Sequence, residues 1–351
     1  MGIISTLRNL FSKREEAYEK RGSKGPHRDL DHSSGRKDSH ATNSTDVSSV
    51  TSPSSSTRNA NSSNGYSFQY KDGRRYHADT EVAYVLPNDD DEVDRVHQQH
   101  WIFRYALQGN YFAPVKDKLL EGIIVLDSGC GPATWTFEMG ETYPRSTFHG
   151  IDASCVFPED IKPANVEFII SNIAKDVPFE DNYFDYIHQR LLILGLTSED
   201  WDNTLDNLYR VLKPGGYLEL AEPDIQDLTK AGPAMHKLQS ILLKMSTDRN
   251  LPPDIALELK DRLAKAGFVD IEERITNIPL NHGGKVGKLL WDDYNHVYTN
   301  MKGILSRINP EWENAEAYTA HLQACAVEAK KSKTCLKWHS IHCRKPEETT
   351  P

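Results

Sequence analysis

The stretch IIVLDSGCGPATW, residues 123–135, decides the fold of this 351-residue chain. A short, β-branched apolar run ends in Asp127, and Gly129 and Gly131 follow at alternate positions. Such a run is typical of a strand buried in a parallel sheet, and the two glycines permit a tight turn into a helix. A loop of this kind can hold a phosphate, hold a different nucleotide-like cofactor, or simply join a strand to a helix.

Strand-like and helix-like segments alternate around this stretch. Helical periodicity with leading acids marks residues 89–107, and further helices are expected over 198–213, with Ser198 as the N-cap, and over 254–268, ending at Gly267. Six more segments have strand character, namely residues 147–152, 166–173, 183–192, 214–224, 269–280 and 336–345. The alternation predicts an α/β fold, a Rossmann-like, doubly wound parallel sheet of seven strands with helices on both faces. Its ligand should lie at the carboxyl ends of the first strands.

Charge and composition divide the chain at about residue 65. Residues 1–65 carry ten Lys and Arg against seven Asp and Glu, whereas the remainder carries 31 against 44, within a total formal charge of −10. The serine-rich part of the tail, from residue 22, has too few apolar side chains to offset the entropy of ordering, so residues 1–65 are expected to be disordered. The acidic remainder disfavours binding to a nucleic-acid backbone.

The N-terminus and the cysteines leave two alternatives open. Gly2 and Thr6 fit the loose myristoylation pattern, so the N-terminus is either a weak membrane anchor or a frayed, soluble segment. No run approaches the ~18 apolar residues of a membrane span and no secretory leader is present, so the cytoplasm or nucleus is expected. Cys335, His339, His342 and Cys343 resemble metal ligands, but their segment alternates like a strand, and we expect a strand and no metal.

Asp127 decides between the alternatives for the glycine loop. It lies two residues before Gly129, where a pyrophosphate would have to rest, and two unit charges at ~5 Å repel by ~3 kcal/mol at an effective dielectric near 20. A ligand that carries positive charge and no phosphate is favoured instead, and S-adenosylmethionine, with its sulfonium and ammonium, fits. Asp152 follows Gly131 by 21 residues and can accept both ribose hydroxyls.

Five segments in order carry a family resemblance: VLDSGCGPATW, GIDAS, VEFIISNI, VPFEDNYFDYIHQR and LYRVLKPGGYLEL. They resemble the successive motifs of class I S-adenosylmethionine-dependent methyltransferases. The upstream segments GRRYH and DDEVDRVHQQHWIFRYAL are similar to fungal members near the trans-aconitate methyltransferases and the regulators of secondary metabolism. The resemblance covers residues 66–346 and implies one methyltransferase domain there, with S-adenosylmethionine as cofactor and an unidentified methyl acceptor, either a small molecule or a protein.

The resemblance also implies roles for individual residues. The first motif, Asp127, Gly129, Cys130 and Gly131, would surround the methionyl group. Asp152 would bind the ribose, with Ala153 against the adenine. Asn172 and Ile173 would reach the adenine amino group, and the backbone of Gln189 would pass the methionyl group. Ala133 stands where many members have a third glycine, and its methyl group is tolerable if φ is not positive.

Candidates for chemistry are fewer. His188 is the best candidate for a general base by residue type, although packing is the plainer interpretation. Arg190 could pair with an acceptor carboxylate or with Glu222, and Asp224 lies nearby in sequence. Trp135 is interpreted as helix packing and His100 as a hydrogen-bonded core histidine.

Residues 281–330 form the expected acceptor lid, with Trp291, Tyr294, Tyr298 and Met301 at helical spacing, either as core or as a grip on an apolar acceptor. Tyr76 and His77 could close over the cofactor. Two other functions remain open, a non-catalytic cofactor-binding regulator that acts through partners and an NAD-dependent oxidoreductase. Oligomeric state has no signal in the sequence.

Overall fold

The computed structural model describes residues 68–71, 73–77, 82–158 and 160–347. The predicted disordered tail, residues 1–65, and the lipidation pattern at Gly2 lie outside these ranges. Within them, no helix has the length and apolar character that crossing a membrane requires.

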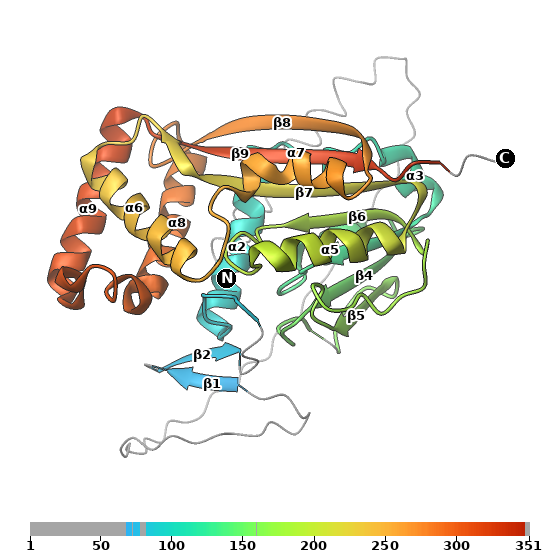
Figure 1. Ribbon diagram of the computed structural model, residues 1–351, viewed down its shortest axis with the longest axis horizontal. Coiled ribbons are helices and arrows are strands. Elements are labelled where there is room, and N and C mark those ends of the chain that lie inside the picture. The colour runs from blue at the N-terminus through green and yellow to red at the C-terminus, as the bar shows by residue number, and fades with distance from the viewer. Residues whose placement is uncertain (1–67, 72, 78–81, 159, 348–351) are drawn as a thin grey trace, which may run out of the picture. The chain divides into compact units, whose positions relative to one another are not determined.

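Seven strands form one sheet, in the order β5-β4-β3-β6-β7-β9-β8 (Figure 1). Each of the seven segments with strand character is one of these strands, and β3, β4, β5, β6 and β7 pair in parallel, as predicted. The strands are β3 (Ile124–Ser128), β4 (Thr147–Asp152), β5 (Val166–Ile170), β6 (Phe184–Arg190), β7 (Leu212–Thr229), β8 (Val269–Pro279) and β9 (Cys335–Arg344). The carboxyl ends of β3, β4 and β6 therefore meet at one edge, which is where a ligand was expected.

The last strand departs from the parallel prediction, because β9 runs antiparallel to both neighbours, β7 and β8. The connection explains the direction. Between β8 and β9 the chain forms only helices, and it re-enters the sheet where β8 ended, with Cys335 paired to Pro279. The Cys335–Cys343 segment is a strand, as expected from its alternation.

Both faces of the sheet are buried, as the doubly wound prediction requires. In β3, Leu126 belongs to the core beneath α5 and α7, whereas the adjacent Val125 belongs to the core beneath α3 and α4. Alternate side chains point to opposite faces of a strand, so both neighbours are buried only if helices cover both faces. The helices are α2 (Asp90–Ala106), α3 (Lys116–Glu121), α4 (Thr134–Thr142), α5 (Ser198–Val211), α6 (Pro233–Asp248), α7 (Ile255–Lys265), α8 (Lys285–Leu305), η1 (Pro310–Glu313) and α9 (Ala315–Ser332).

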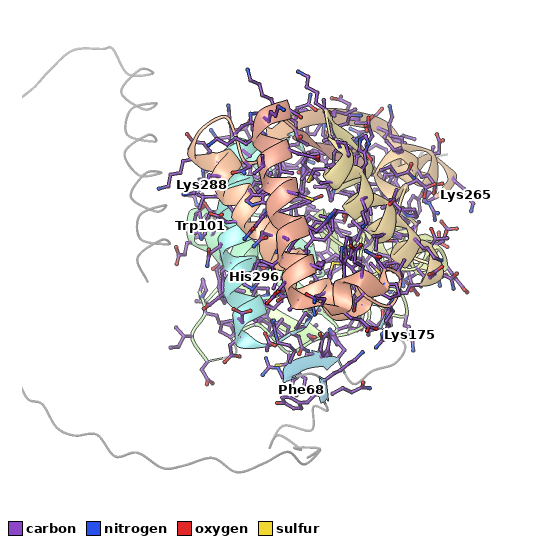
Figure 2. All side chains as sticks on the ribbon, turned by 90° about the vertical axis from the view of Figure 1, so that its left-hand side faces the viewer. Phe68, Trp101, Lys175, Lys265, Lys288 and His296 are labelled. Atoms are coloured by element: carbon purple, nitrogen blue, oxygen red, sulfur yellow. The ribbon has the colours of Figure 1, made fainter. Side chains whose placement is uncertain are left out.

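A second group of helices gathers at one end of the sheet. Helices α6, α8 and α9 pack on one another, and α2 packs along α8 (Figures 1 and 2). His296 of α8 contacts Asp91 of α2 through an Nε2–Oδ2 distance of 2.8 Å. A short hairpin, β1 (Phe68–Lys71) with β2 (Arg74–His77), precedes α2 and was not predicted from sequence.

Local capping sets the ends of the helices. The N-cap of α5 is Thr197 and not Ser198, because the Thr197 hydroxyl and the Asp200 side chain form a reciprocal capping box. The sequence offered two adjacent hydroxyls, and the acid three residues after Thr197 distinguishes them. Helix α7 ends as predicted, with Gly267 just beyond it at a φ of +95°.

Candidate functional site

The loop between β3 and α4 is built from three left-handed residues at alternate positions. Gly129, Gly131 and Ala133 have φ values of +68°, +53° and +63°. Alanine was expected to be tolerable only without a positive φ, so this condition fails, and the left-handed backbone costs Ala133 ~1–2 kcal/mol. The fully buried methyl group packs with Cys130 and Phe157, and this packing offsets part of the cost.

A glycine in β4 lets this loop approach the sheet. A Cβ on Gly150 would lie 2.6 Å from Cδ1 of Phe168 and 3.0 Å from Sγ of Cys130. Cys130 also donates its backbone N–H to the carbonyl oxygen of Ile151 at 2.9 Å. The hydrogen bond thus holds the loop against β4, and the lack of a Cβ on Gly150 leaves room for the Cys130 side chain.

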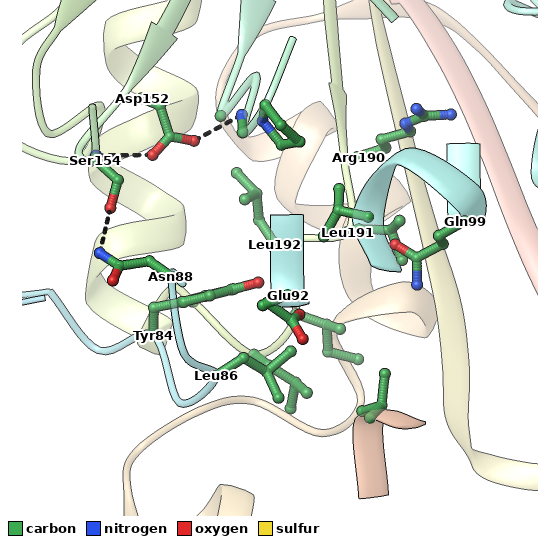
Figure 3. A pocket seen from close by; sticks show the side chains of 18 of the residues that line it. Tyr84, Leu86, Asn88, Glu92, Gln99, Asp152, Ser154, Arg190, Leu191 and Leu192 are labelled. Carbon is green, nitrogen blue, oxygen red and sulfur yellow. Dashed lines mark hydrogen bonds between the residues drawn. The ribbon is translucent and has the colours of Figure 1, made fainter. Parts of the chain in front are cut away.

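Asp152 ends β4 and holds the same loop from the other side (Figure 3). Its Oδ2 accepts the backbone N–H of Gly131 at 2.8 Å, and its Oδ1 accepts that of Ser154 at 2.8 Å. The Ser154 hydroxyl in turn contacts Nε2 of His77 at 2.5 Å and accepts from Nδ2 of Asn88 at 3.3 Å. Burial raises the pKa of Asp152 above its ordinary value, although both hydrogen bonds favour the carboxylate.

A cavity of about 260 Å³ opens beside this loop, at the carboxyl ends of the parallel strands. Eight of the nine residues predicted to bind a cofactor line it: Asp127, Gly129, Cys130, Gly131, Asp152, Ala153, Asn172 and Ile173. Gln189, whose backbone was predicted to pass the methionyl group, is not among the lining residues, and its buried side chain accepts from the Ser128 hydroxyl at Oε1, at 2.9 Å. Asn172 keeps its Oδ1 toward its own loop, where it accepts from the N–H of Ala174 at 3.1 Å.

The candidate base His188 is not among the residues that line the cavity. Its ring stacks on the buried Trp135 at a centroid distance of 4.0 Å, and its Nδ1 lies 3.4 Å from Oδ1 of Asp127. The other oxygen of Asp127 accepts from the hydroxyl of Thr136 at 2.5 Å. His188 therefore supports Asp127 from behind and does not face an acceptor, and Trp135 is a packing residue, as interpreted.

Arg190 pairs neither with Glu222 nor with any carboxylate within 4 Å in the described part of the chain. Its guanidinium donates to Nδ1 of His100 at 2.7 Å, and Nε2 of His100 donates to Glu138 at 2.7 Å. His100 is thus hydrogen-bonded at both nitrogens, as expected, and also lines the cavity. Glu222 instead accepts the backbone N–H groups of Leu192 and Ile193 at 2.8 and 3.2 Å.

Asp224 is likewise committed to backbone. It accepts the N–H groups of Gln226 and Asp227 at 2.9 and 3.1 Å. Both acids lie within β7 and accept hydrogen bonds from backbone N–H groups, so neither is free to act on a ligand.

The half of the cavity away from Asp152 is mostly apolar. Its wall comes from α2, α6, α8 and β9, with side chains that include Phe103, Leu242, Tyr294, Val297, Tyr298, Met301 and Leu336. Of the predicted aromatic stripe on α8, Trp291 packs in the core. Tyr294 and Tyr298 pack against the core and also line the cavity, and their ring centroids are 5.2 Å apart. Burial raises the pKa of Tyr294 to about 12 and that of Tyr298 well above its ordinary value.

A cluster of three charged side chains lies in this mostly apolar half and was missed from sequence. Arg95 of α2 pairs with Glu92 at 2.6 Å and with Asp293 of α8 at 2.7 Å, and all three side chains are almost fully buried. Asn300 donates to the second oxygen of Glu92 at 2.7 Å, and Gln99 to that of Asp293 at 3.0 Å. The available signal was the Glu92–Arg95 pair on the same face of α2 as the predicted apolar stripe.

Comparisons with known proteins agree with this arrangement. The family model described as "Methyltransferase domain" matches residues 125–216, which run from β3 into β7. The methyltransferase pytC of Aspergillus terreus is 32% identical over 280 residues, covering 73% of this chain and 75% of that protein. The N-methyltransferase gliN of Aspergillus fumigatus is 25% identical, covering 76% and 98%. The protein-methionine methyltransferase laeA of Emericella nidulans is 31% identical, covering 66% of this chain and 62% of that longer protein.

Proposed function

Because the chain belongs to the class I S-adenosylmethionine-dependent methyltransferases, we propose that the cavity beside the β3–α4 loop binds S-adenosylmethionine between Asp152 and that loop. The cofactor's sulfonium supplies a methyl group that an acceptor takes by direct displacement. Two observations support the fit. A Cβ on Gly131 would meet no atom within 4 Å, so the loop backbone borders open space, and the partly buried Asp152 carboxylate faces the same cavity with lone pairs to spare.

In this proposal the two aspartates, Asp152 and Asp127, lie at opposite ends of the cofactor. Asp152 and Ala153 take the adenosyl end, Asn172 and Ile173 border the adenine, and Asp127 supplies negative charge beside the cationic end. Asp127 is itself oriented by Thr136 and His188, so its position does not depend on the ligand. The residues of the loop bring backbone N–H groups close to the cofactor, as left-handed glycines permit.

We place the acceptor in the apolar half, against helix α8 within the lid region 281–330. The observation that carries this proposal concerns proton transfer: His100, Glu92 and Asp293, which line the cavity, are all engaged by other side chains and offer no free base. Burial lowers the pKa of His100 to about 4 with both its nitrogens engaged, and Glu92 and Asp293 are paired with Arg95. The cavity tyrosines keep their protons, since burial raises the pKa of Tyr294 and Tyr298.

A methyltransferase without a base suits an acceptor whose lone pair is free at neutral pH. A thioether sulfur meets that condition, and so does an unprotonated nitrogen within an apolar molecule. A phenol, a thiol or an alkylammonium would first have to lose a proton. Two relatives are consistent with this class, since gliN is named an N-methyltransferase and laeA a protein-methionine methyltransferase. Their acceptors support the chemical class proposed for this chain and not the identity of its acceptor.

The test compares acceptors that differ in one atom. The full chain is incubated with S-adenosylmethionine and N-acetylmethionine amide, an aromatic amine, a phenol or a thiol of similar size, and S-adenosylhomocysteine release is followed from pH 6 to 9. We expect turnover of the thioether or the amine at a rate that is flat with pH. Preferential methylation of the phenol or thiol, with a rate that climbs with pH, would contradict the proposal.

A pair of variants locates the acceptor. Val297→Trp fills the apolar half and should abolish turnover while S-adenosylhomocysteine binding is retained. Val327→Trp is the matched control, because Val327 is 67% exposed on α9 and should leave both properties unchanged. Equal turnover in the two variants would mean that the acceptor lies elsewhere.

A further inference from the structure

Arg190 is a buried cation that makes no direct ion pair with a carboxylate of the described residues. It ends β6, lines the cavity and has no carboxylate oxygen within 4 Å among the described residues. The hydrogen bond that holds it comes from a neutral partner, Nδ1 of His100 at 2.7 Å. A buried guanidinium without an anion is costly, and residues of this kind normally pair with a carboxylate or a phosphate.

The side chains around Arg190 hold it without a direct ion pair, and the carboxylates of Asp127, Glu138 and Glu219 act on it only through space. His100 accepts from Arg190 at Nδ1, so its proton is on Nε2, which donates to Glu138. Burial lowers the pKa of His100 to about 4, which keeps the ring neutral near pH 7. The charge of Glu138 is already matched by Arg104, at an Nε–Oε1 distance of 2.6 Å. Burial lowers the pKa of Arg190 as well, because the distant carboxylates do not offset the cost of taking the guanidinium out of water.

The position of Arg190 matches one end of the cofactor. Strand β3 lies between β4, which carries Asp152, and β6, which carries Arg190, so the two charges stand ~10 Å apart across the sheet. Figure 3 shows them on opposite sides of the cavity view. Asp127, at the end of β3, lies between them. A carboxylate next to a guanidinium suits an amino-acid zwitterion, whose ammonium would face Asp127 and whose carboxylate would face Arg190.

We propose that Arg190 binds the carboxylate of the cofactor's methionyl group, and that His100 and Glu138 are positioning residues for its guanidinium. The inference rests on the proposed function of the cavity and adds the residue that reads the cofactor's amino-acid end. A guanidinium and a carboxylate form two parallel N–H···O bonds, which lysine cannot reproduce.

Two ligands that differ only at that end provide the test. S-adenosylhomocysteine carries the amino-acid group, and 5′-deoxy-5′-methylthioadenosine is an adenosyl thioether without it. Both are titrated calorimetrically into the wild-type full chain and into Arg190→Gln, Arg190→Lys and Arg104→Gln. Arg104 is the matched control, because it pairs with the same Glu138 and is not among the lining residues.

In Arg190→Gln we expect S-adenosylhomocysteine to bind ~10–150-fold more weakly, as for the loss of a hydrogen bond between charged groups, while methylthioadenosine changes less than twofold. Arg190→Lys should recover part of the loss, and Arg104→Gln should keep the wild-type ratio of the two affinities. Unchanged binding of both ligands, or an equal loss for both, would overturn the proposal. If the wild type bound neither ligand, the proposed function itself would fail.

Discussion

Replacement of Asp152 by asparagine tests the geometry on which the cofactor pocket depends. The carboxylate accepts two backbone N–H groups, from Gly131 and Ser154, both at 2.8 Å. Asparagine has the same shape but offers one oxygen and one NH₂ group, so one of the two backbone donors must face another donor. A hydrogen bond to a charged group is worth ~1.5–3 kcal/mol, and we expect the free energy of unfolding to fall by that amount.

Cofactor binding should weaken in the same variant, because the asparagine oxygen must serve both the protein and the ribose. The loss of one such bond corresponds to ~10–150-fold in the dissociation constant for S-adenosylhomocysteine. Urea unfolding and calorimetric titration of the full chain measure the two effects, with Asp160→Asn, an exposed acid outside the cavity lining, as control. Wild-type affinity and stability in Asp152→Asn would refute the argument that this carboxylate holds the loop and the ribose.

Three further changes have distinct outcomes. Gly129→Ala should destabilise the protein more than Gly131→Ala. Both glycines have positive φ values, but only at Gly129 would an added Cβ meet Leu192, at 2.9 Å. Thermal melting of the two variants checks this, and equal melting temperatures would contradict it. Burial raises the pKa of Glu222 to about 8, so the folded state binds its proton more tightly than the unfolded state, and stability should fall from about pH 4.5 to 8 by at most ~1.4 kcal/mol per unit. Urea unfolding across that range should show this slope in the wild type and lose its contribution in Glu222→Gln; identical slopes would exclude the titration. Arg95→Met should cost ~3–5 kcal/mol in urea unfolding, because it strands two buried carboxylates, and a loss below ~1 kcal/mol would mean that they ionise poorly.

The order of the elements was predictable from sequence because parallel strands buried on both faces leave strong local signals. The apolar run before Asp127 and the alternation in Cys335–Cys343 were both interpreted correctly as strands. The direction of β9 was not predictable, since alternation is the same for a strand running either way. It depends on where α9 returns the chain to the sheet, which no local pattern contains.

The site divides in the same way. Residues that follow strands were predictable, because the carboxyl ends of parallel strands meet at one edge, and so the eight cofactor candidates line one cavity. The hydrogen-bond partners of the side chains were not predictable. Arg190 donates to His100, which is ninety residues earlier in the chain, and does not pair with Glu222. Residue type also proved a poor guide to the base, because His188 is a histidine at the expected strand but is not among the residues that line the cavity.

The place of β9 in the sheet has a consequence for how the chain is made. This strand is the last in sequence among those described, yet it lies between β7 and β8 and is the partner that β8 pairs with. While the protein is being synthesised, β8 therefore has no partner strand, and β7 presents an unpaired edge, until residues 335–344 emerge. Leu336, which lines the apolar half of the cavity, belongs to that segment. A nascent chain can thus complete the β3–α4 loop well before the wall of the apolar half of the cavity is finished.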